Sequence, residues 1–170
     1  LRLMPDRKAI ERESRGIFAA RVVAFFLLII LLVLYALNSP SIVALSIPLP
    51  TWLRWTGVAL GLASLLLWAW AQAELGKEWS PQLQLRKKHR LVTTGPYALV
   101  RHPLYAAMLG WGASVALVTA NWIFMFLVAV IIPGLLLRVP KEEKMMVEEF
   151  GEEYKKYGRK VRYRLVPRTW

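Results

Sequence analysis

Residues 102–137 read HPLYAAMLGWGASVALVTANWIFMFLVAVIIPGLLL and contain no Lys, Arg, Asp or Glu. This uncharged block is too long for a single membrane-spanning helix, which needs about 20 mostly apolar residues. Its only polar interruption is Thr119-Ala120-Asn121-Trp122. We therefore expect two short antiparallel membrane spans, Leu104–Val118 and Trp122–Leu137, joined by a tight turn.

Charge is distributed in blocks along the rest of the chain. The 170 residues are 56% hydrophobic and contain no Cys, yet the net charge is +12. The net charge is +3 over residues 1–21, +4 over residues 74–101 and +4 over residues 138–170. In residues 22–73 the only charged residue is Arg54. Apolar segments separated by basic segments are typical of a polytopic membrane protein with its basic segments in the cytoplasm. This composition excludes a disordered chain and a disulfide scaffold. Because the basic residues flank apolar spans, the positive-inside rule already explains them, and a nucleic-acid-binding surface is not expected.

Two further stretches, Ile17–Leu37 and Trp52–Ala73, are also long and apolar enough to span a bilayer. We predict an all-α, polytopic helical membrane protein with four transmembrane helices. Both termini and the active site would lie on the cytoplasmic side of the cell membrane. Residues 40–50 are a re-entrant segment, an interfacial segment or a fifth span. After residue 138 we expect an amphipathic helix that runs through about Tyr157.

The candidate chemistry lies at the two ends of the long uncharged block. Arg101-His102-Pro103 begins the first span, where the free N–H groups of a helix start favour a carboxylate. Arg138 and Glu142 follow the second span and share one helical face if the helix continues through Pro140. An antiparallel hairpin brings both ends together, which suits a small zwitterionic ligand. The plainer alternatives are a helix cap for His102 and a solvated ion pair for Arg138 and Glu142.

Several common catalytic motifs are absent from the sequence. It contains no GxGxxG or GxxxxGK[ST] phosphate loop. With two His and no HExxH motif, a metal site is not expected. No Ser lies in a GxSxG elbow.

Some short stretches are distinctive when taken together: Gly95-Pro96-Tyr97, Arg101-His102-Pro103-Leu104-Tyr105, Glu142-Glu143, Phe150-Gly151-Glu152-Glu153-Tyr154 with Tyr157, and Arg164-Leu165-Val166-Pro167. In this combination they resemble the isoprenylcysteine carboxyl methyltransferase family. The similarity covers roughly residues 80–167, and residues 1–75 match only as hydrophobic spans. It implies one membrane-embedded domain over residues 1–170, with the N-terminal spans in 1–75 and a cofactor-binding catalytic portion in 76–167.

The resemblance implies S-adenosyl-L-methionine as cofactor and S-adenosyl-L-homocysteine as product. Glu142 would bind the cofactor's ammonium or ribose, His102 and the helix start its carboxylate, and Arg138 the substrate carboxylate, so that these three are the catalytic residues. Tyr97 and Tyr105 would pack against the adenosyl portion. With the turn at Gly95 and the helix start at Arg101, the predicted cofactor-binding set is Gln82, His89, Arg90, Leu91, Val92, Gly95, Tyr97, Arg101, His102, Pro103, Leu104, Tyr105 and Glu142.

The favoured function is methyl transfer to the carboxylate of a hydrophobic or lipidated, isoprenylcysteine-like substrate at the membrane interface. One alternative is N-methylation of a phospholipid or another lipid amine, with Glu143 as the candidate base. A second alternative is a non-enzymatic membrane adaptor with a polybasic lipid-binding tail. The expected partners are a lipid-like or prenylated small substrate and the lipid bilayer, and no nucleic acid.

Overall fold

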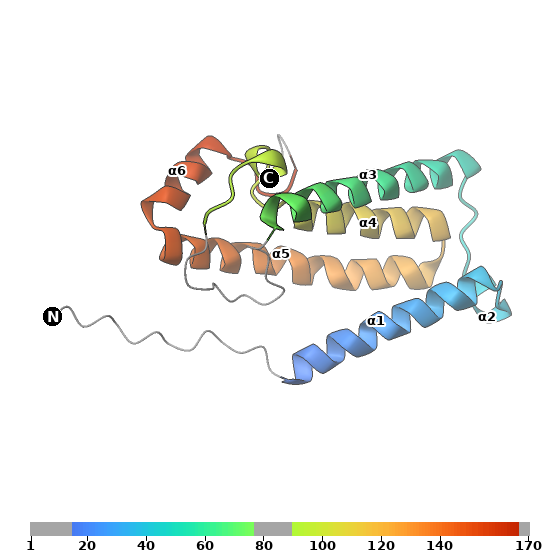
Figure 1. The fold of residues 1–170 in the computed structure, drawn as a ribbon. Coiled ribbons are helices and arrows are strands. Elements are labelled where there is room, and N and C mark those ends of the chain that lie inside the picture. The colour runs from blue at the N-terminus through green and yellow to red at the C-terminus, as the bar shows by residue number, and fades with distance from the viewer. Residues whose placement is uncertain (1–14, 77–89, 167–170) are drawn as a thin grey trace.

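A computed structural model describes residues 15–76 and 90–166, and the regular elements of these residues are helical (Figure 1). The all-α prediction is therefore confirmed for the described part of the chain. In chain order the elements are α1 (Arg15–Ala36), α2 (Pro40–Val43), α3 (Thr51–Leu75), the 3₁₀ helix η2 (Gly95–Ala98), α4 (Pro103–Thr119), α5 (Trp122–Phe150) and α6 (Glu152–Lys160).

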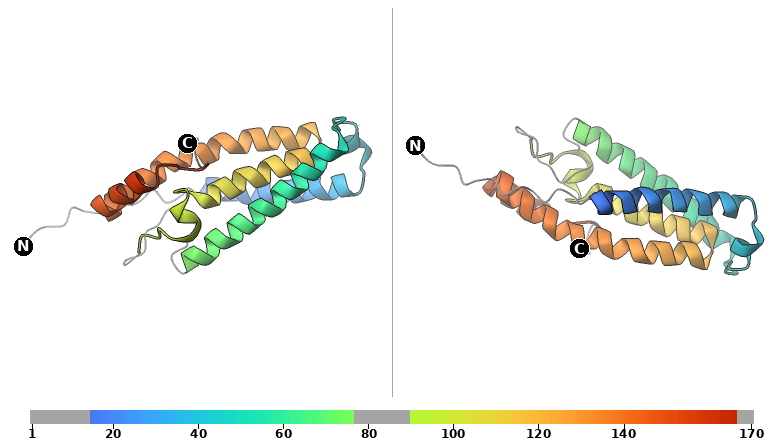
Figure 2. Two further views of the ribbon diagram at one scale, coloured as in Figure 1. Left: turned by 90° about the horizontal axis from the view of Figure 1, so that it is seen from above. Right: turned by 90° about the horizontal axis from the view of Figure 1, so that it is seen from below.

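Helices α3, α4 and α5 lie side by side, and α1 lies on one side of them (Figure 2). Small residues bring α3 and α4 close together. A Cβ atom added at Gly61 would collide with the hydroxyl of Ser114, and one added at Gly110 would collide with the hydroxyl of Ser64. Close backbone approach through small residues is characteristic of helix pairs in membranes, where packing and hydrogen bonds replace the hydrophobic drive.

The turn between α4 and α5 is held by hydrogen bonds to α2 and to the segment that follows it. Asn121 is fully buried, and its side-chain Nδ2 donates to the carbonyl of Ile42 at 2.7 Å. Its Oδ1 accepts from the N–H of Ile123 at 3.0 Å, which caps the start of α5. Residues 40–50 thus form one turn of helix, α2, and a connecting stretch in which Ser46 pairs with Asn121 of the α4–α5 turn. They are too short a helix to be a fifth span.

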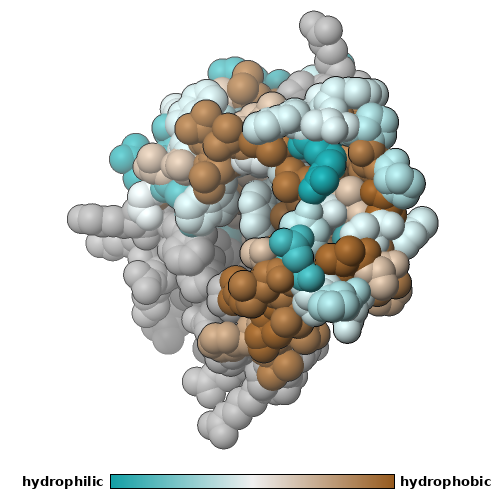
Figure 3. Space-filling model, turned by 90° about the vertical axis from the view of Figure 1, so that its right-hand side faces the viewer, coloured by the Kyte–Doolittle hydropathy of each residue, from teal (hydrophilic) through white to brown (hydrophobic). Residues whose placement is uncertain are grey.

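The surface of the helical layer is unusually apolar. Trp52, Trp55, Phe126 and Leu137 are each about two-thirds exposed. Within the described residues, α3 and α5 are long and apolar enough to cross a membrane, yet only 11% and 17% of their apolar windows are buried inside the protein. Helices of a soluble core would be mostly buried, so these exposed faces suit lipid. Viewed from the α2 end, hydrophobic side chains are prominent on the surface (Figure 3).

The charged C-terminal part differs from the prediction in one respect. Helix α5 continues through Pro133 and Pro140 to Phe150, but it does not run on to Tyr157. Gly151 adopts φ +54° and ψ −123°, a conformation open essentially to glycine alone, and this ends α5 and turns the chain into α6. The prediction of one amphipathic helix that runs through about Tyr157 is therefore wrong.

Helix α6 is itself amphipathic, as expected for this segment. Tyr154 and Tyr157 on one face are buried, and they form a cluster with Val161. Lys155 and Lys156 on the opposite face are exposed. The buried tyrosines dock α6 on the rest of the protein, so its orientation is fixed by packing.

Candidate functional site

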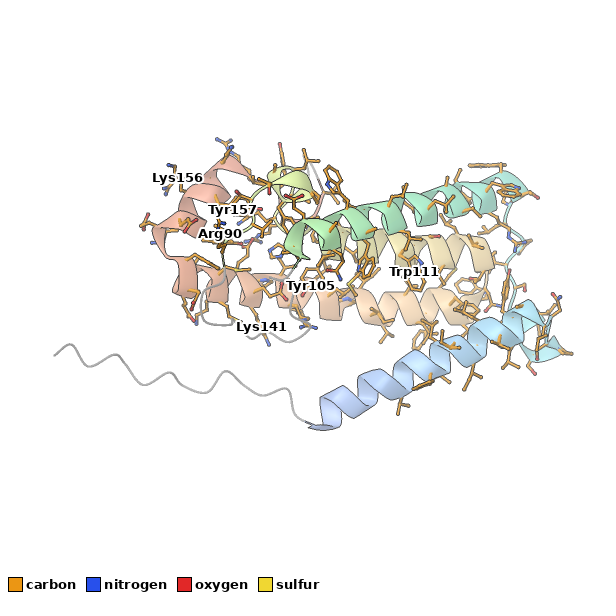
Figure 4. The ribbon with its side chains drawn as sticks, in the orientation of Figure 1. Arg90, Tyr105, Trp111, Lys141, Lys156 and Tyr157 are labelled. Atoms are coloured by element: carbon orange, nitrogen blue, oxygen red, sulfur yellow. The ribbon has the colours of Figure 1, made fainter. Side chains whose placement is uncertain are left out.

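The start of α4 and the charged part of α5 meet at one end of the bundle. The His102 ring lies between two adjacent glutamates: Nδ1 is 3.7 Å from Oε2 of Glu142, and Nε2 is 3.5 Å from Oε1 of Glu143. The Tyr105 hydroxyl donates to Oε1 of Glu142. In Figure 4, Tyr105 lies at the junction of α4 and α5. The prediction that the hairpin brings these two ends together is confirmed.

The backbone before α4 is held by the C-terminal segment. The N–H groups of Arg101 and His102 donate to the carbonyls of Tyr163 and Arg164, at 3.0 and 2.8 Å. The His102 side chain makes no capping hydrogen bond, so the plain helix-cap explanation does not apply. Because these two N–H groups are already bonded, an anion at this helix start would have to use other donors.

Glu143 is the centre of a buried ionic cluster. Its Oε1 lies 2.8 Å from Nη1 of Arg101 and its Oε2 lies 3.0 Å from Nη2 of Arg164, while the Glu143 side chain is only 12% exposed. Burial by itself raises the pKa of Glu143, but the contact with His102 and the charges of both arginines outweigh it and lower the pKa. The carboxylate is thereby stabilised in its charged form, which makes it a weak base.

Tyr97 presents a buried hydroxyl group beside this cluster. No residue in 15–76 or 90–166 forms a hydrogen bond with that hydroxyl. Burial, and then the nearby Tyr157, Glu142 and Glu74, raise the pKa of Tyr97, so the group remains a protonated donor at neutral pH. The Tyr157 hydroxyl donates to the carbonyl of Tyr97 at 2.7 Å and anchors η2 to α6.

The turn that carries Tyr97 is pinned to the end of α3. The Thr94 hydroxyl donates to the carboxylate of Glu74. Gly95 has φ +58°, and a Cβ atom added there would lie 2.8 Å from Oε2 of Glu74. The backbone at Gly95 thus lies close to the Glu74 side chain, and both the backbone conformation and the lack of space favour glycine.

Arg138 lies on α5 one turn before Glu142, nearer the apolar part of the helix. Because α5 is continuous through Pro140, the two residues share a helical face, which fulfils the condition set by the sequence. Arg138 is half-buried and forms no ion pair with any described residue. The solvated ion pair between Arg138 and Glu142 is thus not present, and Glu142 is engaged by Tyr105 instead.

The remaining predicted residues are spread over the neighbouring segments. Pro103 and Leu104 begin α4, and residues 90–92 precede η2, with Leu91 packed against the tyrosines of α6. Gln82 and His89 lie outside the described residues.

Two residues of this site were not predicted from the sequence, and a third was predicted in a different role. Arg164 and Tyr157 were not singled out for this site, and Glu143 was considered only as a base for an amine. The adjacent Glu142-Glu143 pair was a visible signal for Glu143. Arg164 belongs to a motif that the sequence showed, but that motif did not indicate its contacts, because its partners His102 and Glu143 lie far away in the sequence.

Comparisons with known proteins agree with this arrangement. The sequence model of the isoprenylcysteine carboxyl methyltransferase (ICMT) family matches residues 55–148, more than half of the chain. That match begins inside α3, so the similarity reaches further into the N-terminal spans than the motifs indicated, and it ends before α6.

Curated relatives include protein-S-isoprenylcysteine O-methyltransferases from three kingdoms. The chain is 27% identical to form B of Arabidopsis thaliana over 113 residues, covering 65% of this chain and 57% of that protein. It is 34% identical to the Schizosaccharomyces pombe enzyme over 76 residues (44% and 32%) and 31% identical to the Mus musculus enzyme over 114 residues (65% and 40%). The chain thus spans 32–57% of the length of these relatives.

A solved structure of the eukaryotic intramembrane Ras methyltransferase ICMT has the same fold. The TM-score is 0.60 at 22% identity, over 89% of this chain and 52% of that one. At this identity the likeness concerns the fold alone. Together with the exposed apolar faces of α3 and α5, it identifies an integral membrane protein.

Proposed function

This chain belongs to the isoprenylcysteine carboxyl methyltransferase family, and we propose that it methylates the carboxylate of a hydrophobic or lipidated substrate, such as an isoprenylcysteine. The names of its relatives support this reaction, although the chain spans only part of their length. The observation that carries the proposal is the placement of Arg138 and Glu142 on one face of α5, where the apolar span meets charge.

S-adenosylmethionine is the proposed methyl donor, and when bound it supplies an electrophilic methyl group on a sulfonium. The residues present suit such a ligand. The buried Tyr97 hydroxyl lacks a partner among the described residues and can donate. The Glu142 carboxylate, oriented by Tyr105 and His102, can accept from an ammonium or a ribose hydroxyl. Glu142 is near enough to Tyr97 to raise the pKa of its hydroxyl, which is consistent with one ligand that contacts both side chains.

Arg138 is the proposed anchor for the acceptor carboxylate. Its guanidinium can form a charge-assisted, bidentate pair with a carboxylate, and its position toward the apolar part of α5 suits an acceptor whose tail lies in lipid. A carboxylate is already ionised at neutral pH, so the acceptor needs no base. The contribution of the protein is then alignment and exclusion of water.

The proposed membrane arrangement has four spans, α1, α3, α4 and α5. The basic residues before α1, between α3 and α4 and after residue 138 favour the cytoplasm for both termini and the site. The lipidated substrate would then reach Arg138 sideways from the bilayer, while the cofactor would arrive from the cytoplasm.

N-methylation of a lipid amine is less well supported. A protonated amine would have to lose a proton, and Glu143 was the candidate base. Its contacts with His102, Arg101 and Arg164 lower its pKa, so it is poorly suited to that role.

The decisive experiment combines the purified protein with donor labelled on the methyl group and an S-farnesylcysteine derivative as acceptor. Base treatment releases methanol from a methyl ester but not from a methylamine. We expect base-labile product from the unaltered protein and from Lys141→Ala. We expect loss of turnover with retained S-adenosylhomocysteine binding for Arg138→Ala.

Binding of S-adenosylhomocysteine is measured separately by calorimetry. Glu142→Gln and His102→Ala should weaken it. Absence of binding by the unaltered protein would favour the membrane adaptor, and base-stable product would favour the amine reaction. Unchanged turnover in Arg138→Ala would remove the proposed role of Arg138.

A further inference from the structure

A basic hollow opens between the end of α5 and α6, where Arg101 and Glu143 form part of its wall. Its volume is about 570 Å³. Its lining includes four cations, Arg101, Lys144, Lys155 and Arg159, and only one acid, Glu143. We propose that this hollow binds the phosphate of an anionic lipid headgroup. The inference goes beyond methyl transfer and requires only that α5 spans the membrane.

The cations of the hollow are not fully compensated within the protein. Glu143 is shared between Arg101 and Arg164. Lys155 pairs at 2.7 Å with an exposed acid of its own helix, a contact of little strength. Within residues 15–76 and 90–166, Lys144 and Arg159 form no ion pair. An excess of positive charge around one concavity attracts an anion, and arginine and lysine are the usual phosphate ligands.

The shape of α6 keeps the hollow open. Gly158 lines it in the last turn of α6, and glycine within a helix costs up to about 1 kcal/mol relative to alanine. A Cβ atom there would lie 3.5 Å from Nη1 of Arg101, in ordinary contact. A larger side chain there would project toward Arg101 and narrow the hollow, whereas glycine leaves this part of it open.

The position of the hollow along α5 favours the phosphate of a lipid headgroup over a soluble phosphate as its ligand. About 20 helical residues from Trp122 rise about 30 Å, the thickness of the hydrocarbon core, and end at Lys141. The lining residues Glu143–Val147 lie about 3–9 Å further along, which overlaps the headgroup layer of about 5–8 Å.

The test compares two double variants that remove the same charge. Lys144→Gln/Arg159→Gln removes two cations from the hollow. Lys141→Gln/Lys156→Gln removes two exposed cations of α5 and α6 that do not line it and that extend away from the ribbon in Figure 4. Equal net charge means that general attraction to an anionic surface changes equally in both proteins.

The measurement is the Tm of detergent-solubilised protein titrated with dioleoyl phosphatidylglycerol, with phosphatidylcholine as the neutral lipid. We expect a saturable rise in Tm with phosphatidylglycerol for the unaltered protein and for the Lys141/Lys156 variant. For the Lys144/Arg159 variant we expect an apparent affinity about tenfold weaker or more. If that double variant does not fold, the single variants Lys144→Gln and Arg159→Gln provide the same comparison.

Three results would overturn the proposal. Equal lipid responses in the two double variants would mean that only general surface charge matters. An equal rise in Tm with glycerol 3-phosphate alone would assign the hollow to a soluble phosphate. Displacement of phosphatidylglycerol by S-adenosylhomocysteine would assign it to the methyl donor. Since none of these readouts measures methyl transfer, failure here is distinct from failure of the proposed activity.

Discussion

Replacement of Glu143 by Gln should destabilise the protein substantially. The substitution keeps the size of the side chain but removes the charge that joins Arg101, before α4, to Arg164 in the C-terminal segment. Loss of one partner from a buried ion pair costs about 3–5 kcal/mol. Arg164 is 33% exposed, and solvent screens that half of the cluster, so we expect about 2–4 kcal/mol. For a chain of this size the Tm would fall by about 5–15 °C.

Thermal unfolding in detergent micelles measures this change, and Glu152→Gln is the matched control. Glu152 also pairs with a cation, Lys155, but both side chains are exposed, so no measurable change is expected. Equal Tm values for Glu143→Gln and Glu152→Gln would refute the idea that the buried cluster fastens the C-terminal segment.

The pH dependence of stability gives a second readout of the same cluster. The folded-state pKa of Glu143 is lowered from the ordinary value of 4.5, so its stabilisation is fully present above pH 4.5. That stabilisation is lost as the pH falls through the lowered pKa. The unaltered protein should therefore lose more stability than Glu143→Gln on acidification below 4.5, and parallel acid profiles would contradict the assignment.

Two further substitutions test the site and its scaffold. Asn121→Ala removes the side-chain oxygen that caps α5 at Ile123 and one of the two donors to the Ile42 carbonyl, which keeps the N–H of Leu45, and should cost about 1–3 kcal/mol in thermal unfolding. Tyr105→Phe removes the hydroxyl that orients Glu142, and calorimetry should show S-adenosylhomocysteine binding weakened about tenfold with little change in Tm.

Hydropathy predicted the helices well because each span is a local property of the sequence. The starts of α4 and α5 fell within one residue of the predicted positions, at a proline and after a capping Asn121. The turn at Gly151 was not predicted, since its neighbours on both sides favour a helix and only the glycine backbone reveals the break. Residues 161–166 were not assigned a role, because their hydrogen bonds to residues 101–102 are long-range and leave no periodic pattern.

The site shows most clearly where sequence reasoning stops. Glu142 and Glu143 are chemically identical neighbours, but successive residues of a helix point about 100° apart. Glu142 therefore faces Tyr105, with Arg138 one turn before it on the same face, whereas Glu143 faces the arginines and the wall of the basic hollow. His102 contacts both carboxylates and so joins the two sides.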